Sequence, residues 1–135
     1  MKFYIAGRFV NKDEVAAFAR HVRGSGHDVI STWTDERHSP TVEMSEVSDE
    51  ELADTACRDL QEIIDCDRMI FFAESDTFAT ARNGRHVEFG IALALGKRID
   101  VIGPRENIFH HCFNVFHYPS KVMYLTMLGS ALARV

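Results

Sequence analysis

The stretch that decides the fold is GRHVEFGIALALGK, residues 84–97. It predicts a helix rich in alanine and leucine whose apolar side chains pack into a core, namely Ile91, Leu93, Ala94 and Leu95. One carboxylate, Glu88, falls near the predicted first turn, where the helix dipole stabilises an acid whatever its function. Two flanking glycines, Gly84 and Gly90, allow a backbone or a ligand to approach that acid closely. We therefore favour a functional interpretation of Glu88 over that of an ordinary helix-start acid.

Strands and helices alternate on both sides of this stretch. Apolar and β-rich runs predict strands at residues 2–6, 27–33, 69–72, 99–102 and 115–118. Further helices are predicted from Asn11 or Asp13 to residues 24–26, from Ser48 to about Asp65, and from Ser120 onward. The first is expected to bury Val15, Phe18, Ala19 and Val22, and the second to turn inward Leu52, Ala56, Leu60 and Ile63.

Continuous apolar strands separated by helices predict an α/β fold with a parallel sheet that is covered on both faces. In such sheets ligands bind beyond the carboxyl ends of the strands. Four predicted loops meet at that edge: Gly7-Arg8, Trp33 with the polar segment 34–48, residues 74–85, and residues 103–107. This convergence predicts a cleft for a small molecule.

Composition narrows the class of protein. The chain has 135 residues, and we interpret residues 1–135 as a single domain long enough to bury a core. A net charge of -5 argues against a nucleic-acid partner, which would need a basic surface. No apolar run suits a membrane span, and the N-terminus lacks the layout of a signal peptide. Three cysteines without CxxC spacing indicate neither disulfides nor a zinc site, so we expect a cytoplasmic protein.

The predicted cleft is rich in acids, arginines and aromatic rings. Its candidates are the carboxylates Asp59, Glu74, Asp76 and Glu88, the arginines Arg8, Arg82, Arg85 and Arg105, and the aromatics Tyr4, Phe9 and Trp33. Acids and rings together suit a sugar that carries a flat base, because a glutamate can attack or stabilise an anomeric carbon. Arginines suit a phosphate through two-point hydrogen bonds. The chain has neither a GxGxxG nor a Walker A sequence, and His110-His111 lacks the further ligands of a metal site.

Several of these residues also have a plainer interpretation. Asp59 could be a solvated acid on a helix, and Tyr4, which alternates with its neighbours along a strand, could be core. Trp33, at a strand end, could either pack in the core or stack on a base. Arg8 could be exposed to solvent or face a phosphate.

Three segments carry a resemblance to a known family. They are Tyr4-Ile5-Ala6-Gly7, the stretch from Ala56 to Asp59-Leu60, and Gly84-Arg85-His86-Val87-Glu88-Phe89-Gly90 followed by ALALGK. In their residues and order they resemble the nucleoside 2-deoxyribosyltransferase-like superfamily, which includes the 2'-deoxynucleoside 5'-monophosphate N-glycosidases. The similarity extends from Lys2 to the last helix.

The resemblance implies a flavodoxin-like Rossmannoid fold with a five-stranded parallel sheet, and cleavage of an N-glycosidic bond. Glu88 would be the nucleophile, Asp59 would position the sugar or protonate the base, and Tyr4 would orient Glu88 or the sugar. The residues expected to bind the substrate are Gly7, Arg8, Phe9, Trp33, Asp76, Gly84, Arg85, His86 and Asn107. The resemblance further implies a homodimer or larger assembly with a shared active site, and no metal or organic cofactor.

One position departs from the family pattern. Transferases of this group carry an acid about six residues before the nucleophile, where this chain has Arg82; Asp76, Ser75 or Thr77 could take over its role. We favour a nucleotide hydrolase over a transferase because Arg8, Arg82 and Arg85 would give the cleft a positive rim. The alternatives are a non-catalytic nucleotide-binding module and, less favoured, a flavodoxin-like electron carrier.

Overall fold

The computed structural model describes residues 1–35, 47–75 and 83–129. Over these ranges five strands form one parallel sheet in the order β2-β1-β3-β4-β5. The strands are β1 (Lys2–Ala6), β2 (Asp28–Val29), β3 (Arg68–Phe72), β4 (Arg98–Ile102) and β5 (Val115–Tyr118). This is the flavodoxin-like order, so the predicted α/β fold with a five-stranded parallel sheet is confirmed.

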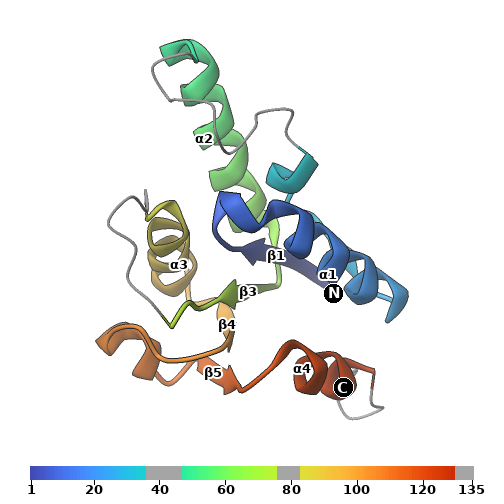
Figure 1. Ribbon diagram of the computed structural model, residues 1–135. Coiled ribbons are helices and arrows are strands. Elements are labelled where there is room, and N and C mark those ends of the chain that lie inside the picture. Colours follow the sequence, from blue (N-terminus) through green and yellow to red (C-terminus); the bar gives the residue numbers. More distant parts are fainter. Residues whose placement is uncertain (36–46, 76–82, 130–135) are drawn as a thin grey trace.

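Two pairs of helices cover the sheet (Figure 1). Helices α1 (Lys12–Gly24) and α4 (Lys121–Leu128) contact each other, as do α2 (Asp49–Asp65) and α3 (Gly84–Ala94). Two neighbouring residues of β3 show that the helix pairs lie on opposite faces of the sheet, because successive side chains of a strand point in opposite directions. The ring of Phe72 packs on Phe18 of α1, whereas the ring of Phe71 packs on Phe89 of α3.

The helix starts follow from local hydrogen bonds. Ser48 caps α2 by accepting a bond from the Glu51 amide at 3.2 Å, and Ser120 caps α4 in the same way through Met123. Side-chain oxygens at these positions satisfy amides that the helix itself leaves unpaired. Asn11 precedes α1 but its side chain makes no capping bond, and it reaches Glu74 instead.

The prediction for the inward face of α2 was largely wrong. Ile63 is buried, but Ala56 is exposed and Leu60 is 41% exposed. Figure 1 shows the reason, since most of α2 extends beyond the sheet that was expected to cover it. Periodicity identifies the apolar side of a helix, but it does not show what lies against that side.

The register of α3 also differs from the prediction. The helix begins at Gly84, so Glu88 lies in its second turn, beyond the first-turn position that the helix dipole favours. The side chains that α3 buries are Arg85, Phe89 and Ala92, whereas Ala94 and Leu95 are exposed and Ile91 and Leu93 are half-buried. A start at Gly84 brings positions i, i+4 and i+7 from Arg85 onto the sheet.

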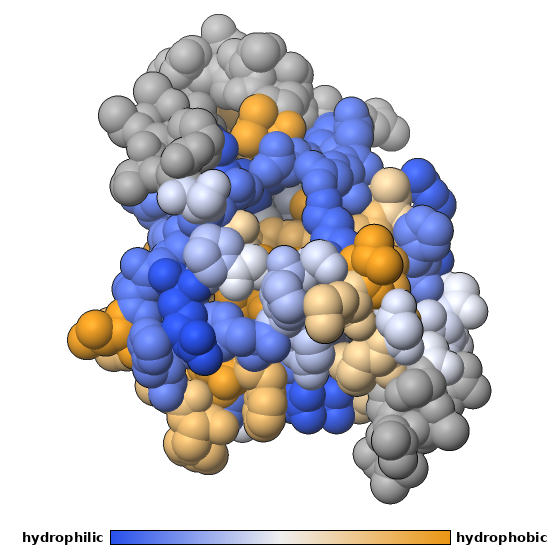
Figure 2. All heavy atoms as spheres, turned by 60° about the horizontal axis from the view of Figure 1, so that its bottom comes forward, coloured by the Kyte–Doolittle hydropathy of each residue, from blue (hydrophilic) through white to orange (hydrophobic). Residues whose placement is uncertain are grey.

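Three shorter helical turns link these elements, namely η1 (Phe9–Asn11), η2 (Trp33–Asp35) and η4 (Ile108–His111). The predicted strand at 27–33 is therefore reduced to β2, and its end forms η2. Near η4 and β5 several large apolar side chains are exposed, namely Ile108, Phe109, Phe113 and Phe116. Figure 2, which brings this side forward, shows hydrophobic residues interspersed with hydrophilic ones. None of the helices in the described ranges has the length and apolarity to cross a membrane.

Candidate active site

Tyr4 of β1 lies where α2 and α3 meet the sheet. Its side chain is fully buried, and both burial and nearby negative charges raise the pKa of its phenol. After burial, the largest causes are the negative charges of Glu88 and Asp59, and the charge of Glu62 adds to them. The structure thus brings together three residues that are far apart in the sequence, Tyr4, Asp59 and Glu88.

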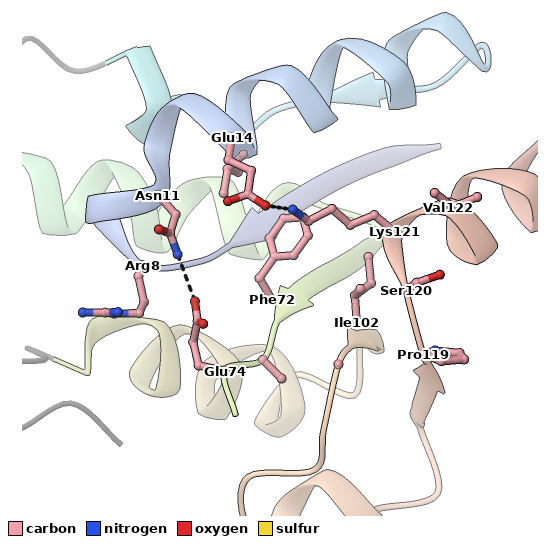
Figure 3. Close-up of a pocket in the computed structure, with 13 residues that line it drawn as sticks. Arg8, Asn11, Glu14, Phe72, Glu74, Ile102, Pro119, Ser120, Lys121 and Val122 are labelled. Atoms are coloured by element: carbon pink, nitrogen blue, oxygen red, sulfur yellow. Dashed lines mark hydrogen bonds and ion pairs between the residues drawn. The ribbon is translucent and has the colours of Figure 1, made fainter. Parts of the chain in front are cut away.

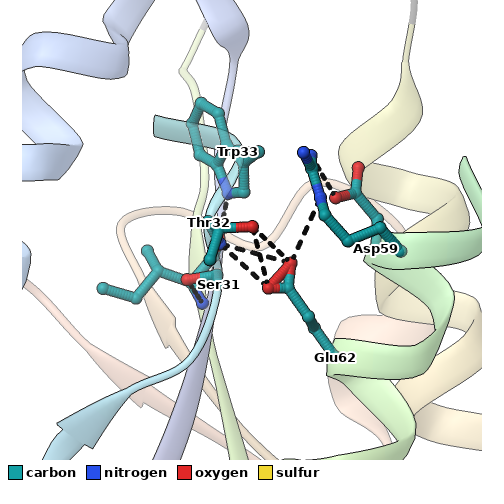
Figure 4. Close-up of polar contacts among 7 residues, drawn as sticks. Ser31, Thr32, Trp33, Asp59 and Glu62 are labelled. Carbon is teal, nitrogen blue, oxygen red and sulfur yellow. Dashed lines mark hydrogen bonds and ion pairs between the residues drawn. The ribbon is translucent and has the colours of Figure 1, made fainter. Parts of the chain in front are cut away.

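Asp59 is held by its neighbours on α2 (Figure 4). Arg58 Nη2 contacts Asp59 Oδ1 at 2.9 Å, and Arg58 Nε lies 3.6 Å from Glu62 Oε1. The Asp59 side chain is 21% exposed, so it is not the freely solvated helix acid of the plainer interpretation. Arg58 therefore links the two acids that this face of α2 presents towards Tyr4.

Glu62 connects this group to the segment after β2. Its carboxylate accepts bonds from the Thr32 amide and hydroxyl at 3.0–3.2 Å. Burial raises the pKa of Glu62 and the nearby Asp59 adds to the rise, while the Thr32 bonds and Arg58 oppose it. The sequence analysis did not single out Glu62; its spacing of three residues from Asp59, which puts both on one helix face, was the available indication.

Glu88 is half-buried on α3, with one carboxylate oxygen buried, and open space lies at the glycines before and after it. A Cβ atom added to Gly84 or Gly90 would meet no heavy atom within 4 Å in the described structure. Packing within the described chain therefore does not explain either glycine, although glycine inside a helix costs about 1 kcal/mol relative to alanine. This observation fits the expectation that something outside these elements approaches Glu88.

Arg85 has a different place from the one predicted. Its side chain is 7% exposed, and both Nη atoms bind the carboxylate of Glu106, with Nη2 at 2.7 Å from Oε1. Its guanidinium also lies 5.1 Å from the centre of the Phe71 ring. The expectation that Arg85 belongs to a positive rim is therefore wrong, because its charge is buried and neutralised by an acid that the sequence analysis missed.

Glu106 joins several segments at the carboxyl edge of the sheet. Besides Arg85, its carboxylate accepts a bond from the Glu74 amide at 3.2 Å, and its own amide donates to His110 Nδ1 at 3.1 Å. Burial alone would raise the pKa of Glu106, but the bonds and charge of Arg85 outweigh it and lower that pKa. His86 Nε2 lies 3.7 Å from Glu106, and its own pKa is lowered, first by burial and then by the charge of Arg85.

Trp33 and Gly7 contribute to packing. Trp33 is 6% exposed and donates its indole N–H to the Ile5 carbonyl at 2.6 Å, which places it in the core and not in a stacking position. A Cβ atom on Gly7 would lie 3.2 Å from Val15 and 3.7 Å from the Trp33 ring, so a larger residue would crowd this contact. Phe9 is half-buried, with its ring centre 6.3 Å from that of Trp33.

The other predicted binding residues are scattered. Asn107 is exposed and caps η4, where its Oδ1 accepts a bond from the Phe109 amide at 3.0 Å. Arg8 is half-buried at the carboxyl end of β1. Asp76, Arg82 and Thr77 lie outside the described residues. Within the described ranges no group of three or more His, Cys, Asp or Glu is placed to hold a metal ion.

No protein-family model and no curated protein matches the sequence. Solved structures do. The Clostridium botulinum CMP N-glycosidase BcmB superposes with a TM-score of 0.62 at 21% identity, over 95% of this chain and 98% of that one. A 2-deoxyribosyltransferase from the psychrotolerant bacterium Bacillus psychrosaccharolyticus superposes with a TM-score of 0.69 at 21% identity, over 99% of this chain and 95% of that one. A conserved protein from Enterococcus faecalis V583 superposes with a TM-score of 0.54 at 16% identity, over 96% of this chain and 86% of that one.

The chain shares its fold with these proteins. Coverage of 95% or more of this chain means that the likeness takes in the whole sheet and both helix layers. At such low identity the likeness concerns the fold, and any activity must be argued from the site itself.

Proposed function

We propose that this protein cleaves the N-glycosidic bond of a nucleoside or nucleoside 5'-monophosphate and releases the free base. The observation that carries the proposal is the grouping of Glu88 and Asp59 beside the buried Tyr4 phenol, whose pKa is raised first by burial and then by the charges of these two acids. Acids in such a constellation are suited to glycosidic chemistry. The fold is also that of a CMP N-glycosidase and of a 2-deoxyribosyltransferase, which adds support by analogy.

In this proposal Glu88 is the nucleophile. A carboxylate oxygen of Glu88 bonds to the anomeric carbon from the face opposite the base, and the C–N bond breaks with its electron pair going to the base. Asp59 either holds a sugar hydroxyl or supplies the proton that the leaving base takes up. The buried Tyr4 phenol lies beside these acids and orients the attacking carboxylate or the sugar.

Water completes the proposed hydrolysis. A water molecule attacks the anomeric carbon and gives up a proton to Asp59 or to solvent, the bond to Glu88 breaks with its electron pair returning to the carboxylate, and the sugar or sugar 5'-phosphate leaves. A second base in place of water would make the reaction a transfer. We favour hydrolysis, although the buried pairing of Arg85 with Glu106 removes one of the three arginines on which that preference was based. Arg82 lies outside the described residues, so in the described structure the preference now depends on Arg8, which is half-buried at the carboxyl end of β1.

We also propose that the protein works as a homodimer or larger assembly with a shared active site. Apolar side chains are exposed next to both proposed acids: Leu60 and Ile64 on α2, at 41% and 43%, and Val87 and Leu95 on α3, at 65% and 49%. A second copy that covered them would lie beside Glu88. Val87→Asp should lower the mass measured by light scattering, whereas Val10→Asp, at a similarly exposed apolar position on η1, should not.

Base release from a panel of nucleosides and 5'-monophosphates tests the activity, with and without a second free base. Glu88→Gln should abolish release, and Glu50→Gln, at an exposed position in the first turn of α2, should leave it unchanged. Release that requires an added base would identify a transferase. Base release by folded Glu88→Gln would contradict the role of Glu88. The absence of base release by the wild type with every substrate would favour a non-catalytic binding module.

A further inference from the structure

A hollow of about 460 Å³ lies on the opposite face of the sheet from Glu88 (Figure 3). It opens between α1 and α4 at the carboxyl edge, and we call it the α1–α4 hollow. It is lined by Arg8, Asn11, Glu14, Val15, Phe72, Ala73, Glu74, Ile102, Gly103, Pro119, Ser120, Lys121 and Val122. Phe72 packs on α1, whereas Phe71 beside it in β3 packs on α3, so the two faces are separated by the sheet itself.

The walls of the α1–α4 hollow are mostly apolar. The Phe72 ring lies at the centre of Figure 3, with Ile102 and Val122 further along the same side. Gly103 has a φ of 111°, and a Cβ there would come within 3.1 Å of the Ala73 carbonyl, so glycine is needed where β4 ends against β3. The volume falls in the range of small-molecule sites, about 300–1,000 Å³.

Two polar pairs frame these walls. Asn11 Nδ2 donates to Glu74 Oε1 at 2.9 Å on one side, and Lys121 forms an ion pair with Glu14 on the other. Lys121 therefore already has an anion beside it, while Glu74 is held by a neutral amide. In Figure 3 the guanidinium of Arg8 points away from the space between these pairs. Among the charged side chains of the lining, Glu74 therefore offers a ligand a carboxylate, which accepts hydrogen bonds and donates none; the Ser120 hydroxyl, whose oxygen accepts from the Met123 amide, is a further polar group of the lining.

The main chain of Glu74 is also held by a hydrogen bond. Its backbone amide donates to Glu106 at 3.2 Å, and Glu106 is itself tied to Arg85. A carboxylate whose main chain and side chain are both anchored loses little freedom when a ligand binds to it. The acceptor is thus held in place in advance beside an apolar surface.

We propose that the α1–α4 hollow is a second small-molecule site, which binds an uncharged, flat heterocycle of about nucleoside size that carries an amino group. The ring lies against the apolar wall around Phe72, and the amino group donates to Glu74. A phosphate is disfavoured in this space, because Glu14 and Glu74 both present negative charge, Lys121 is already paired, and the guanidinium of Arg8 points away from it. This proposal does not depend on the activity proposed for Glu88.

Methyl NMR on the whole chain tests the proposal, with adenosine, inosine and AMP as probes. Ile102 and Val122 report on the hollow, and Val87, next to Glu88, reports on the other face. Adenosine should shift the Ile102 and Val122 signals, both in the wild type and in Glu88→Gln. Inosine, which has a carbonyl in place of the amino group, should bind at least about tenfold more weakly, as expected for loss of a hydrogen bond to a charged group. AMP should also bind more weakly than adenosine.

Two variants make the test specific. Val122→Trp fills the hollow from an exposed position and should abolish the Ile102 shift, and Glu74→Gln should remove the preference for adenosine over inosine. Val10→Trp, at an exposed position on η1 outside the hollow, is the matched control and should bind like the wild type. Shifts confined to Val87, equal binding of inosine, or binding that persists in folded Val122→Trp would each overturn the proposal.

Discussion

Arg85 of α3 and Glu106 after β4 form a two-point ion pair that is largely buried, at 7% and 15% side-chain exposure. The pair connects the first turn of α3 to the loop beyond β4. The Glu74 amide, just after β3, donates a hydrogen bond to the same Glu106 carboxylate. Glu88 lies one turn further along α3, so the position of the proposed nucleophile depends on this contact.

Glu106→Gln should therefore destabilise the protein. Removal of one partner leaves the Arg85 charge buried without its anion, and breaking a buried pair costs about 3 kcal/mol. Urea denaturation measures the loss, and Glu50→Gln, an exposed acid, serves as the control. A change in the free energy of unfolding as small as that of the control would show that the pair is not important for stability.

Stability should fall between pH 6.5 and about pH 4. Burial lowers the pKa of His110 from 6.5 to about 4, outweighing the charge of Glu106, which acts the other way. In this window the unfolded chain takes up a proton that the folded chain does not, so the free energy of unfolding decreases as the pH falls, by up to about 1.4 kcal/mol per pH unit.

His110→Phe provides the comparison for this pH effect. The ring contacts with Phe71 and Phe89 would be kept, while the titrating group would be lost. Denaturation curves of this variant should depend less on pH between 4 and 6.5 than those of the wild type. Identical slopes in the two proteins would assign the effect to other groups.

Tyr124→Phe should cost about 2 kcal/mol, the range for a buried hydrogen bond to a charged group. The Tyr124 hydroxyl donates to Asp100 at 2.7 Å, and the Asp100 side chain is fully buried, with Arg98 Nε as its other partner at 2.9 Å. Thermal denaturation measures the loss. Tyr118→Phe, whose half-buried hydroxyl accepts from Arg98, should cost less.

Local sequence patterns were sufficient for the sheet. Each of β1, β3 and β4 buries four consecutive residues, all of them apolar except Asp100 in β4, and such largely apolar runs predict strands covered on both faces. The pairing of Arg85 with Glu106 could not be predicted in this way, because it joins a helix to a loop 21 residues away. Without the fold, an arginine beside Glu88 suggested a phosphate ligand.

The candidate site was predicted only in part. The order of the segments around Tyr4, Asp59 and Glu88 predicted that they belong together, and the structure brings them together. Glu62 and Thr32 were missed, since their contact joins α2 to the segment after β2. The α1–α4 hollow was also missed, because its walls come from four segments with no shared motif.

Tyr4→Phe should reduce base release about 10- to 100-fold, the scale expected when a reacting group is slightly misplaced. The ring and its packing remain, but the buried hydroxyl beside Glu88 and Asp59 is lost. The measurement is kcat for base release, with circular dichroism to confirm the fold. Unchanged kcat would mean that Tyr4 is only a core residue.

The account depends most on Glu88 as the nucleophile, and peptide mass spectrometry tests this directly. A 2'-fluoro nucleoside slows the second step, so the sugar should stay on the enzyme when the reaction is quenched. Trypsin cuts after Arg85 and Lys97 and yields HVEFGIALALGK, residues 86–97, in which Glu88 is the one side-chain carboxylate. The account predicts the mass of the fluorosugar on this peptide. Base release without that adduct, or an adduct on the peptide that contains Asp59, would contradict it.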